Sequence, residues 1–448
     1  MLKKLLCIFI VVALALSMAS CKRDADGQDG TDTPGNGAVD GDDWGILGYD
    51  IVNAFSEGFA GVYKYGEGGW GYIDTSGEMV IPHSFSIAGP FIDGLAIVSI
   101  PSSDEDRPYR HGLINTDGRL VLGFDYVFIG DFKDGLALVS SIVSYEDEEE
   151  GTLTELEKYG YIDKTGYFVI PLEFDLAQDF SEGLAAVQLE YFHGFINTTG
   201  RTAIPFEYEQ TFSFSEGLAA VTIYGKYGYV DATGKVAIPI ELDYAGRFSE
   251  GLAMAAKSEG GESAKWGYID KTGKTAIPFQ FLSVSDFVDG IAMANLPDGS
   301  GYAFIDRSGR VIARHSDFIT VHGFSEGLAA VRRDGLWGFI DTTGAVTIAC
   351  EYEAVSDKGF SGGLALVKKD NLWGFIDKAG NVAVPIEYNA MFDFSDGFAV
   401  AVKDGKCGVI DTAGNLIVPF EHEIISYVAE GFAFAMNPSG GWDLLKLR

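Results

Sequence analysis

The chain has 448 residues, of which 47% are hydrophobic and 58 are glycine, so it can bury a sizeable core and bulk disorder is excluded. Its 32 basic and 65 acidic residues give a net charge of −33, which excludes nucleic acid as a partner and disfavours electrostatic binding to anionic membrane surfaces. We interpret the acidity as a solvated surface, with attraction of divalent cations or cationic ligands as the alternative.

Residues 1–20 are predicted to be a secretory signal peptide. Lys3 and Lys4 precede an apolar stretch from Leu5 to Leu16, which is too short to span a bilayer and is followed by polar residues. The small residues directly before Cys21 resemble the lipobox of bacterial lipoproteins, although Met18 stands where that pattern usually has leucine. We therefore predict lipid attachment at Cys21 and an extracytoplasmic, membrane-anchored protein of the bacterial cell envelope, with cleavage and release as the alternative.

Residues 21–43 are predicted to be a flexible acidic linker, because they are rich in Asp, Gly and Thr and have almost no large apolar side chains. The remainder, 44–448, is an array of repeats. Phe-Ser-Glu-Gly-Leu-Ala-Ala-Val occurs at 180–187, 214–221 and 324–331. The shortest spacing between the glycines of this element is 34 residues, and the glycines stand at 58, 94, 135, 183, 217, 251, 290, 327, 363, 397 and 431.

Each repeat contains two further elements in a fixed order. Trp373-Gly374-Phe375-Ile376-Asp377 is one example of the second, and Ala383-Val384-Pro385-Ile386 is one example of the third. We expect a three-stranded antiparallel meander from these elements. Because apolar residues occupy both faces of its strands, each unit should be covered on two sides by its neighbours.

An Asp-x-x-Gly turn separates the second and third elements. Aspartate caps a type I turn and glycine takes the left-handed position of the bulge that follows. Asn115 and Asn197 replace the aspartate without losing the cap, so we interpret the series as structural and not as catalytic or calcium-binding carboxylates. The predicted turn-capping residues are Asp74, Asp163, Asp231, Asp270, Asp306, Asp341, Asp377 and Asp411. The same interpretation covers the glutamates before the repeated glycines, at Glu57, Glu182, Glu216, Glu250 and Glu326.

The aromatic residue of the second element is predicted to lie in the core, with a neighbouring ring over the glycine that follows it. The tryptophans at this place are Trp70, Trp266, Trp337 and Trp373. The alternative is an exposed aromatic ladder that binds sugar.

These three elements resemble the bacterial WG-repeat family almost word for word, from about Trp44 to the C-terminus. The departures are His111 and Cys407 in the aromatic position, Gly362 in the glutamate position and Ala349 in the proline position. The resemblance implies a β-repeat architecture on exported or surface proteins, and it supplies no shared catalytic residues.

The repeats predict an all-β fold, and we expect an open superhelical array. Eleven glycine elements exceed the four to eight blades usual for propellers, and 34 residues are short for a four-stranded blade. The alternative is a closed, propeller-like toroid. It is suggested by the fragments Trp44-Gly45-Ile46 and Gly441-Trp442 at the two ends, which together look like one divided repeat.

The other reactive residues give no recognisable site. The acidic run 146–150 is interpreted as a solvated loop, with weak calcium binding as the alternative. Cys350 and Cys407 stand at core positions and are interpreted as small hydrophobic residues, with a disulfide between them as the alternative. The six histidines lack metal-ligand spacing, and we predict no metal, no cofactor and no enzyme activity.

The predicted function is binding or scaffolding through the repeat surface, with an envelope protein or a cell-wall glycan as partner. One alternative is an enzyme or accessory factor with its site in an irregular loop, either the insertion after Val139 or the segment Lys257 to Lys265. The other is a structural spacer.

Overall fold

The computed structural model describes residues 49–146, 153–258, 263–314, 320–438 and 440–447, all within the unit Trp44–Arg448. In these residues the strands form ten four-stranded antiparallel sheets and one two-stranded sheet. Within each sheet the hydrogen-bonded order follows the order along the chain.

The first five sheets are β1(Ile51–Val52) β2(Phe59–Lys64) β3(Gly69–Asp74) β4(Met79–Phe85); β5(Ile87–Ala88) β6(Leu95–Pro101) β7(Tyr109–Asn115) β8(Leu120–Tyr126); β9(Phe128–Lys133) β10(Leu136–Glu146) β11(Leu153–Ile162) β12(Phe168–Phe174); β13(Leu176–Ala177) β14(Leu184–Leu189) β15(Phe192–Asn197) β16(Thr202–Tyr208); and β17(Gln210–Thr211) β18(Leu218–Ile223) β19(Lys226–Asp231) β20(Val236–Leu242). The next three are β21(Tyr244–Ser249) β22(Leu252–Lys257) β23(Lys265–Asp270) β24(Thr275–Phe281); β25(Ser283–Val284) β26(Ile291–Leu296) β27(Gly301–Asp306) β28(Val311–Arg314); and β29(Thr320–Ser325) β30(Leu328–Arg333) β31(Leu336–Asp341) β32(Val346–Tyr352). The last three are β33(Ala354–Ser361) β34(Leu364–Lys369) β35(Leu372–Asp377) β36(Val382–Tyr388); β37(Ala390–Met391) β38(Phe398–Lys403) β39(Lys406–Asp411) β40(Leu416–His422); and β41(Phe432–Met436) β42(Trp442–Lys446).

The repeat is four-stranded, not three-stranded as the sequence analysis predicted. The missing strand is the first of each sheet. It has only two residues in six of the ten four-stranded sheets, and six to eight residues in β9, β21, β29 and β33. Tyr208 closes β16, and Gln210 opens β17, which pairs with β18 through Gln210↔Thr222 and Thr211↔Val221. A two-residue strand needs no loop of its own, and for this reason 34 residues suffice for a four-stranded sheet.

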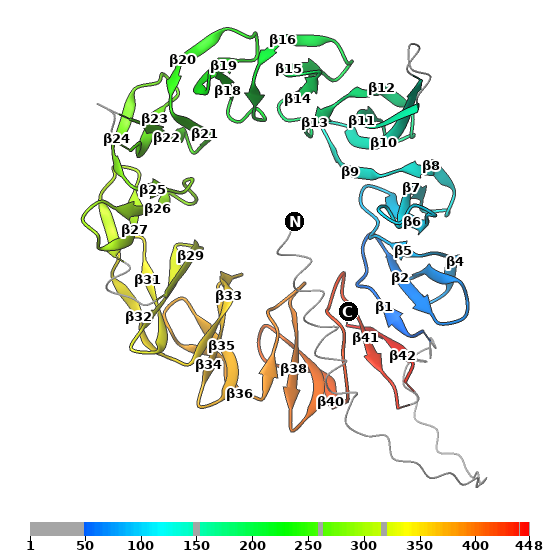
Figure 1. Cartoon of the computed structure of the whole chain (residues 1–448). Helices are drawn as coiled ribbons and strands as arrows, with labels where there is room; N and C mark the ends of the chain where they lie inside the picture. The colour runs from blue at the N-terminus through cyan, green and yellow to red at the C-terminus, as the bar shows by residue number, and fades with distance from the viewer. Residues whose placement is uncertain (1–48, 147–152, 259–262, 315–319, 439, 448) are drawn as a thin grey trace, which may run out of the picture. The chain divides into compact units, whose positions relative to one another are not determined.

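The unit is a closed β-propeller of ten four-stranded blades and a closing two-stranded sheet, and not the open array that we expected (Figure 1). Strands β41 and β42 pack against the first sheet. The ring of Phe55 stacks on Phe434 with centroids 5.5 Å apart, and the indole Nε1 of Trp442 donates to the carbonyl of Asp50 at 3.3 Å. In Figure 1 the first strand of each sheet lies towards the centre of the ring and the fourth lies at its rim.

The core consists of eleven apolar clusters, each between two adjacent sheets of the described chain. Alternation along a strand explains this arrangement, since successive side chains point to opposite faces. In β18, Leu218 and Ala220 pack towards the following sheet, whereas Ala219 and Val221 pack towards the preceding one. Both faces of each sheet are therefore buried by neighbours.

Glycine is required after the aromatic residue of the second element, but for a different physical reason from the one predicted. At Gly374 an added Cβ would lie 2.6 Å from the carbonyl oxygen of Pro385, and at Gly338 it would lie 2.5 Å from that of Ile348. The fourth strand is bulged here and its backbone crosses the glycine closely. Backbone contact, and not an overlying ring, is the common cause. An aromatic side chain is also near at Gly112 and Gly408, where the added Cβ would meet Phe124 and Phe420.

We predict that Phe339→Ala destabilises the ring by about 3–5 kcal/mol, because Phe339 is fully buried and its ring packs at 4.9 Å from that of Phe360 in the next sheet. Denaturant unfolding of the full chain measures the loss. Leu336→Ala, at an exposed position of the same strand, is the control and should change little. Equal losses in the two variants would contradict the assignment of the core.

Candidate functional site

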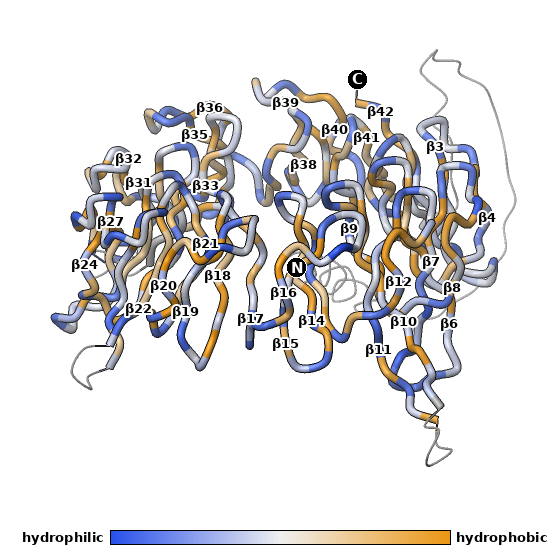
Figure 2. Tube along the Cα trace, turned by 90° about the horizontal axis from the view of Figure 1, so that it is seen from above, coloured by the Kyte–Doolittle hydropathy of each residue, from blue (hydrophilic) through white to orange (hydrophobic). Residues whose placement is uncertain are grey.

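The ring has two faces of different chemistry. Because the strands alternate in direction, the turns between the second and third strands all lie on one face, which we call the hairpin face. In Figure 2 the hairpins β10–β11, β14–β15 and β18–β19 point to the same side. The other face carries the Ser-Glu-Gly and Asp-x-x-Gly turns, and we call it the clasp face.

The Ser-Glu-Gly segments on the clasp face are two-residue turns with both central residues in the left-handed region. Glu57 has φ +53° and Gly58 has φ +78°, and Ser56 exchanges both backbone hydrogen bonds with Phe59. This is the type I′ geometry that joins antiparallel strands most tightly. Glutamate lacks the short side chain with which asparagine and aspartate tolerate this conformation, so its recurrence here needs an additional reason.

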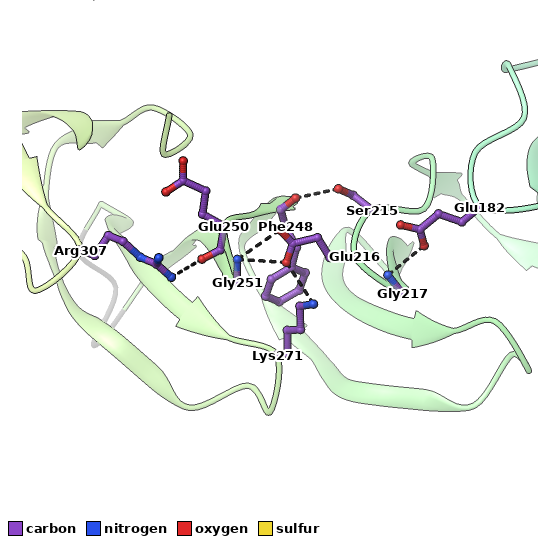
Figure 3. Close-up of polar contacts among 9 residues, drawn as sticks. All are labelled: Glu182, Ser215, Glu216, Gly217, Phe248, Glu250, Gly251, Lys271 and Arg307. Carbon is purple, nitrogen blue, oxygen red and sulfur yellow. Dashed lines mark hydrogen bonds and ion pairs between the residues drawn. The ribbon is translucent and has the colours of Figure 1, made fainter. Parts of the chain in front are cut away.

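The reason is a hydrogen bond to the next sheet (Figure 3). The carboxylate of Glu216 accepts the backbone N–H of Gly251 at 3.0 Å, and the carboxylate of Glu182 accepts that of Gly217 at 2.8 Å. The same contact is made by Glu57, Glu250, Glu326 and Glu430, and Asp134 makes it with the shorter side chain. The hydrogen bond from the N–H of Gly58 to the carboxylate of Glu430 joins the last sheet to the first and so closes the ring.

The serine before the glutamate makes a second link in the same direction. The hydroxyl of Ser215 donates to the carbonyl of Phe248 at 2.7 Å. Equivalent bonds run from Ser56, Ser181, Ser249 and Ser325. We call the paired serine and glutamate contacts the clasp. The recurrent residues that look most like a catalytic series are therefore engaged in holding adjacent sheets together.

Basic residues reinforce some clasps. Lys271 lies 3.1 Å from Glu216, and Lys378 lies 2.9 Å from Glu326. The hydrogen bond from Lys378 is the main cause that lowers the pKa of Glu326 below its ordinary value of 4.5. Arg307 donates instead to the backbone carbonyl of Glu250.

The predicted turn aspartates all lie on the clasp face as hydrogen-bond acceptors. In Asp270, Oδ1 accepts the backbone N–H of Thr272 at 2.9 Å, the hydroxyl of Thr272 at 2.6 Å and the N–H of Lys274 at 3.1 Å. The hydroxyl bond is the main cause of a lowered pKa at Asp270. Among the described residues these aspartates do not come together in any group that would hold a metal ion.

The tryptophans predicted to lie in the core pack against its clusters but are not fully buried. Trp70, Trp266, Trp337 and Trp373 are half-buried at the edges of the clusters, whereas the second aromatic residue of the element, such as Tyr268 or Phe339, is fully buried. The hydroxyl of Tyr268 donates to the carbonyl of Ser285 in the next sheet at 2.8 Å. The sequence pattern did contain this signal, because Tyr or Phe stands at that position in most repeats, with Leu113 and Val409 as exceptions.

Cys350 and Cys407 are both half-buried free thiols. They pack against different clusters, and burial raises the pKa of each thiol. The predicted lipid site, Cys21, and the side chains of the acidic run 146–150 lie outside the described residues.

At two junctions of the described chain an aliphatic residue replaces the serine and an aspartate replaces the glutamate, and a pocket lies beside each. Between sheets β5–β8 and β9–β12, Ile92 replaces the serine and Asp93 replaces the glutamate, and a pocket of about 410 Å³ opens there. Its walls are Leu95, Ile97, Leu113 and Phe132, with Lys133 and Asp131 as polar groups. Between β25–β28 and β29–β32, Val288 and Asp289 make the same replacements beside a pocket of about 290 Å³.

Fold and site together define a repeat-built β-propeller whose recurrent polar residues join its sheets. The chain belongs to the WG containing repeat family, whose model matches residues 70–100, 112–141, 159–191, 194–227, 227–259, 266–296, 302–337, 337–373, 373–407 and 408–437. No curated protein matches the chain. None of the described residues forms a helix long and apolar enough to cross a membrane.

Two solved structures with some likeness are distant in sequence. The extracellular domain of a hybrid two component system from B. thetaiotaomicron has 10% identity and a TM-score of 0.23 over 90% of this chain, which spans only 64% of that structure. A eukaryotic initiation factor has 12% identity and a TM-score of 0.39, covering 78% of this chain and 93% of that one. Likenesses of this size carry no argument about function.

We predict that the ring weakens as pH falls below about 4.5, because the clasp carboxylate of Glu326 and the turn carboxylate of Asp270 have lowered pKa values in the folded chain. A lowered folded pKa contributes stability above the unfolded pKa, and this contribution is lost on protonation. Glu326→Gln should be less stable than the natural chain at neutral pH, and the difference should shrink in acid. Thermal melting across pH measures it, with exposed Glu421→Gln as control. A constant difference at all pH values would contradict the role of the charge.

We predict that restoring a clasp stabilises its junction. The double variant Ile92→Ser and Asp93→Glu should gain about 1 kcal/mol, since one hydroxyl bond and one carboxylate bond replace an aliphatic side chain that is 54% exposed. Hydrogen exchange in β6 and β9 and thermal melting report the gain. Ile92→Ala removes the same side chain without a hydroxyl and should bring none. A gain from the alanine variant as large as that from the double variant would mean that the clasp is irrelevant.

Proposed function

We propose that this chain is a lipid-anchored protein of the bacterial cell envelope that binds or scaffolds another envelope component, either a protein or a cell-wall glycan, through the surface of its propeller. The observation that carries the proposal is that the recurrent residues and the variable residues of the repeat lie in different places. Recurrent residues such as Ser215 and Glu216 are engaged between sheets, whereas the hairpins between second and third strands differ from sheet to sheet and face solvent. Variation on a rigid repeated frame is how repeat proteins obtain specificity.

The cellular location in this proposal, at the membrane of the cell envelope, rests on the sequence alone. Lys3 and Lys4, the apolar stretch and the small residues before Cys21 fit a lipoprotein signal, and residues 21–43 would then act as a tether between the acyl chains and the ring. A surface with a net charge of −33 does not adhere to anionic lipid by itself, so retention at the membrane would depend on the acyl chains.

We predict that Cys21→Ser releases the protein from the membrane fraction, because it removes the site of acylation. Fractionation of cells that express the natural chain or the variant, followed by immunoblotting, measures the distribution. Cys407→Ser, which changes a half-buried thiol in the ring, is the matched control and should stay with the membrane. Retention of the Cys21 variant would refute lipid anchoring.

The binding role is tested with the purified full chain. Saturable co-sedimentation with isolated cell walls, or enrichment of one protein from an envelope extract, is the expected result, and each assay is run with calcium and with chelator. Absence of retention in every condition would refute the binding proposal and favour the spacer.

A further inference from the structure

The exposed aromatic side chains of the hairpin face are unevenly distributed around the ring. Tyrosines stand on the hairpins of the first five sheets, where Tyr65 is 70% exposed, Tyr191 is 84% exposed and Tyr224 is 91% exposed. Tyr109 begins β7 and Tyr145 lies near the end of β10, and both are also exposed. We call Tyr65, Tyr109, Tyr145, Tyr191 and Tyr224 the tyrosine arc.

In three later sheets the same hairpin has small polar residues at its tip, whereas Tyr302 beside the hairpin of β26–β27 is 45% exposed. Asp334-Gly335, Asp370-Asn371 and Asp404-Gly405 form the tips of β30–β31, β34–β35 and β38–β39. These pairs suit a turn with two left-handed residues. The repeat therefore does not require an aromatic residue at this place.

Tyr224 lies at the tip of the β18–β19 hairpin although the backbone conformation there is unfavourable for tyrosine. It has φ +51°, a conformation that costs a bulky residue of the order of 1 kcal/mol or more, and its exposed ring recovers little by burial. The carboxylate of Glu209 holds the turn by accepting the N–H of Tyr224 at 3.0 Å and that of Gly225 at 2.9 Å. A side chain that is costly for folding and lies in solvent is explained by a contact with something else.

A second set of exposed apolar residues lies on the innermost strands of the same sector. The residue that opens the first strand is exposed and large in four consecutive sheets, namely Ile51, Ile87, Phe128 and Leu176. Ile424, which is also exposed, occupies the equivalent place beside β41 by accepting the backbone N–H of Met436. In the remaining sheets the residue at the same register is small or polar, except for the half-buried Tyr244; the others are Gln210, Ser283, Thr320, Ala354 and Ala390. We call this set the inner apolar arc.

Acidic residues accompany both arcs. Glu67 and Glu105 lie on the hairpins of Tyr65 and Tyr109, and Glu155 follows the hairpin of Tyr145. Glu190 precedes Tyr191 and is exposed, as is Glu209 beside the turn of Tyr224. Exposed aromatic and aliphatic surface flanked by carboxylates is complementary to a partner that presents apolar and basic side chains together.

We propose that the tyrosine arc and the inner apolar arc form one docking surface for a basic, amphipathic segment of a partner protein. The inference rests on the proposed function and selects a protein from its two partner classes. Tyrosine and flanking carboxylates would also suit sugar, but the aliphatic side chains of Ile51, Ile87 and Leu176 offer a sugar no hydrogen bonds, whereas they bury well against leucine or valine.

The test uses the full chain and defined probes. A fluorescent peptide of alternating lysine and leucine is titrated by anisotropy, alongside a glutamate and leucine peptide, polylysine and a soluble cell-wall oligosaccharide. We expect the lysine and leucine peptide to bind best, more weakly at high salt, and the double variant Tyr191→Ser with Tyr224→Asn to weaken it about tenfold or more. Asparagine accepts the left-handed backbone at 224, so the variant should fold at least as well as the natural chain.

The matched control is Tyr167→Ser. Tyr167 is 70% exposed, as Tyr65 is, but it follows an Asp-x-x-Gly turn on the clasp face. It should leave binding unchanged. Equal loss in the control and the double variant, equal binding of polylysine, or tyrosine-dependent binding of the oligosaccharide instead of the peptide would each overturn the inference.

Failure of this inference is distinguishable from failure of the proposed function. If the natural chain and the double variant retain cell walls or an envelope protein equally well, the binding role stands and the docking surface lies elsewhere. If neither retains any component, the binding role itself fails.

Discussion

The structure depends on one constraint, which is that no sheet in the ring can leave either face in water. Leu218 and Ala220 need the following sheet, and Ala219 and Val221 need the preceding one. An array with free ends would expose such a surface at each end. Closing the ring removes both ends at once, and the cluster of Phe55, Ala60 and Val62 with Phe434 and Leu444 is the place where this occurs. The two-stranded last sheet covers the first sheet on one side and the sheet β37–β40 on the other.

Apolar packing brings the sheets together, and the clasp fixes their spacing. A glutamate in a left-handed turn costs backbone energy, but it supplies a carboxylate within 3.0 Å of the next glycine N–H and thereby satisfies a backbone donor at the clasp face. Where aliphatic residues replace the serine, as at Ile92 and Val288, the packing becomes hollow. The repeated acidic residues therefore have a mechanical explanation, and their number is no argument for catalysis.

We therefore assign the proposed binding function to the residues that do not join adjacent sheets. The hairpins between second and third strands carry no clasp, and they vary from Asp-Gly pairs to exposed tyrosines around one ring. One sector of the ring differs from the rest in carrying exposed aromatic side chains flanked by carboxylates. A protein that served only as a spacer would not need such an asymmetry. The proposed tether before Trp44 would let that sector turn towards a partner in the envelope.

The sequence by itself determined the repeat, three of its four strands and its turns, because these depend on local spacing: aspartate and glycine set the bulged turn, and alternation sets two buried faces. It also indicated the family. It did not reveal the fourth strand, since two residues such as Gln210 and Thr211 have no periodicity to detect. It did not show how deeply the tryptophans are buried, because burial depends on the neighbouring sheet. Closure was decided only by the tertiary structure, because the angle between successive sheets is a sum of many small packing contacts that no single repeat encodes.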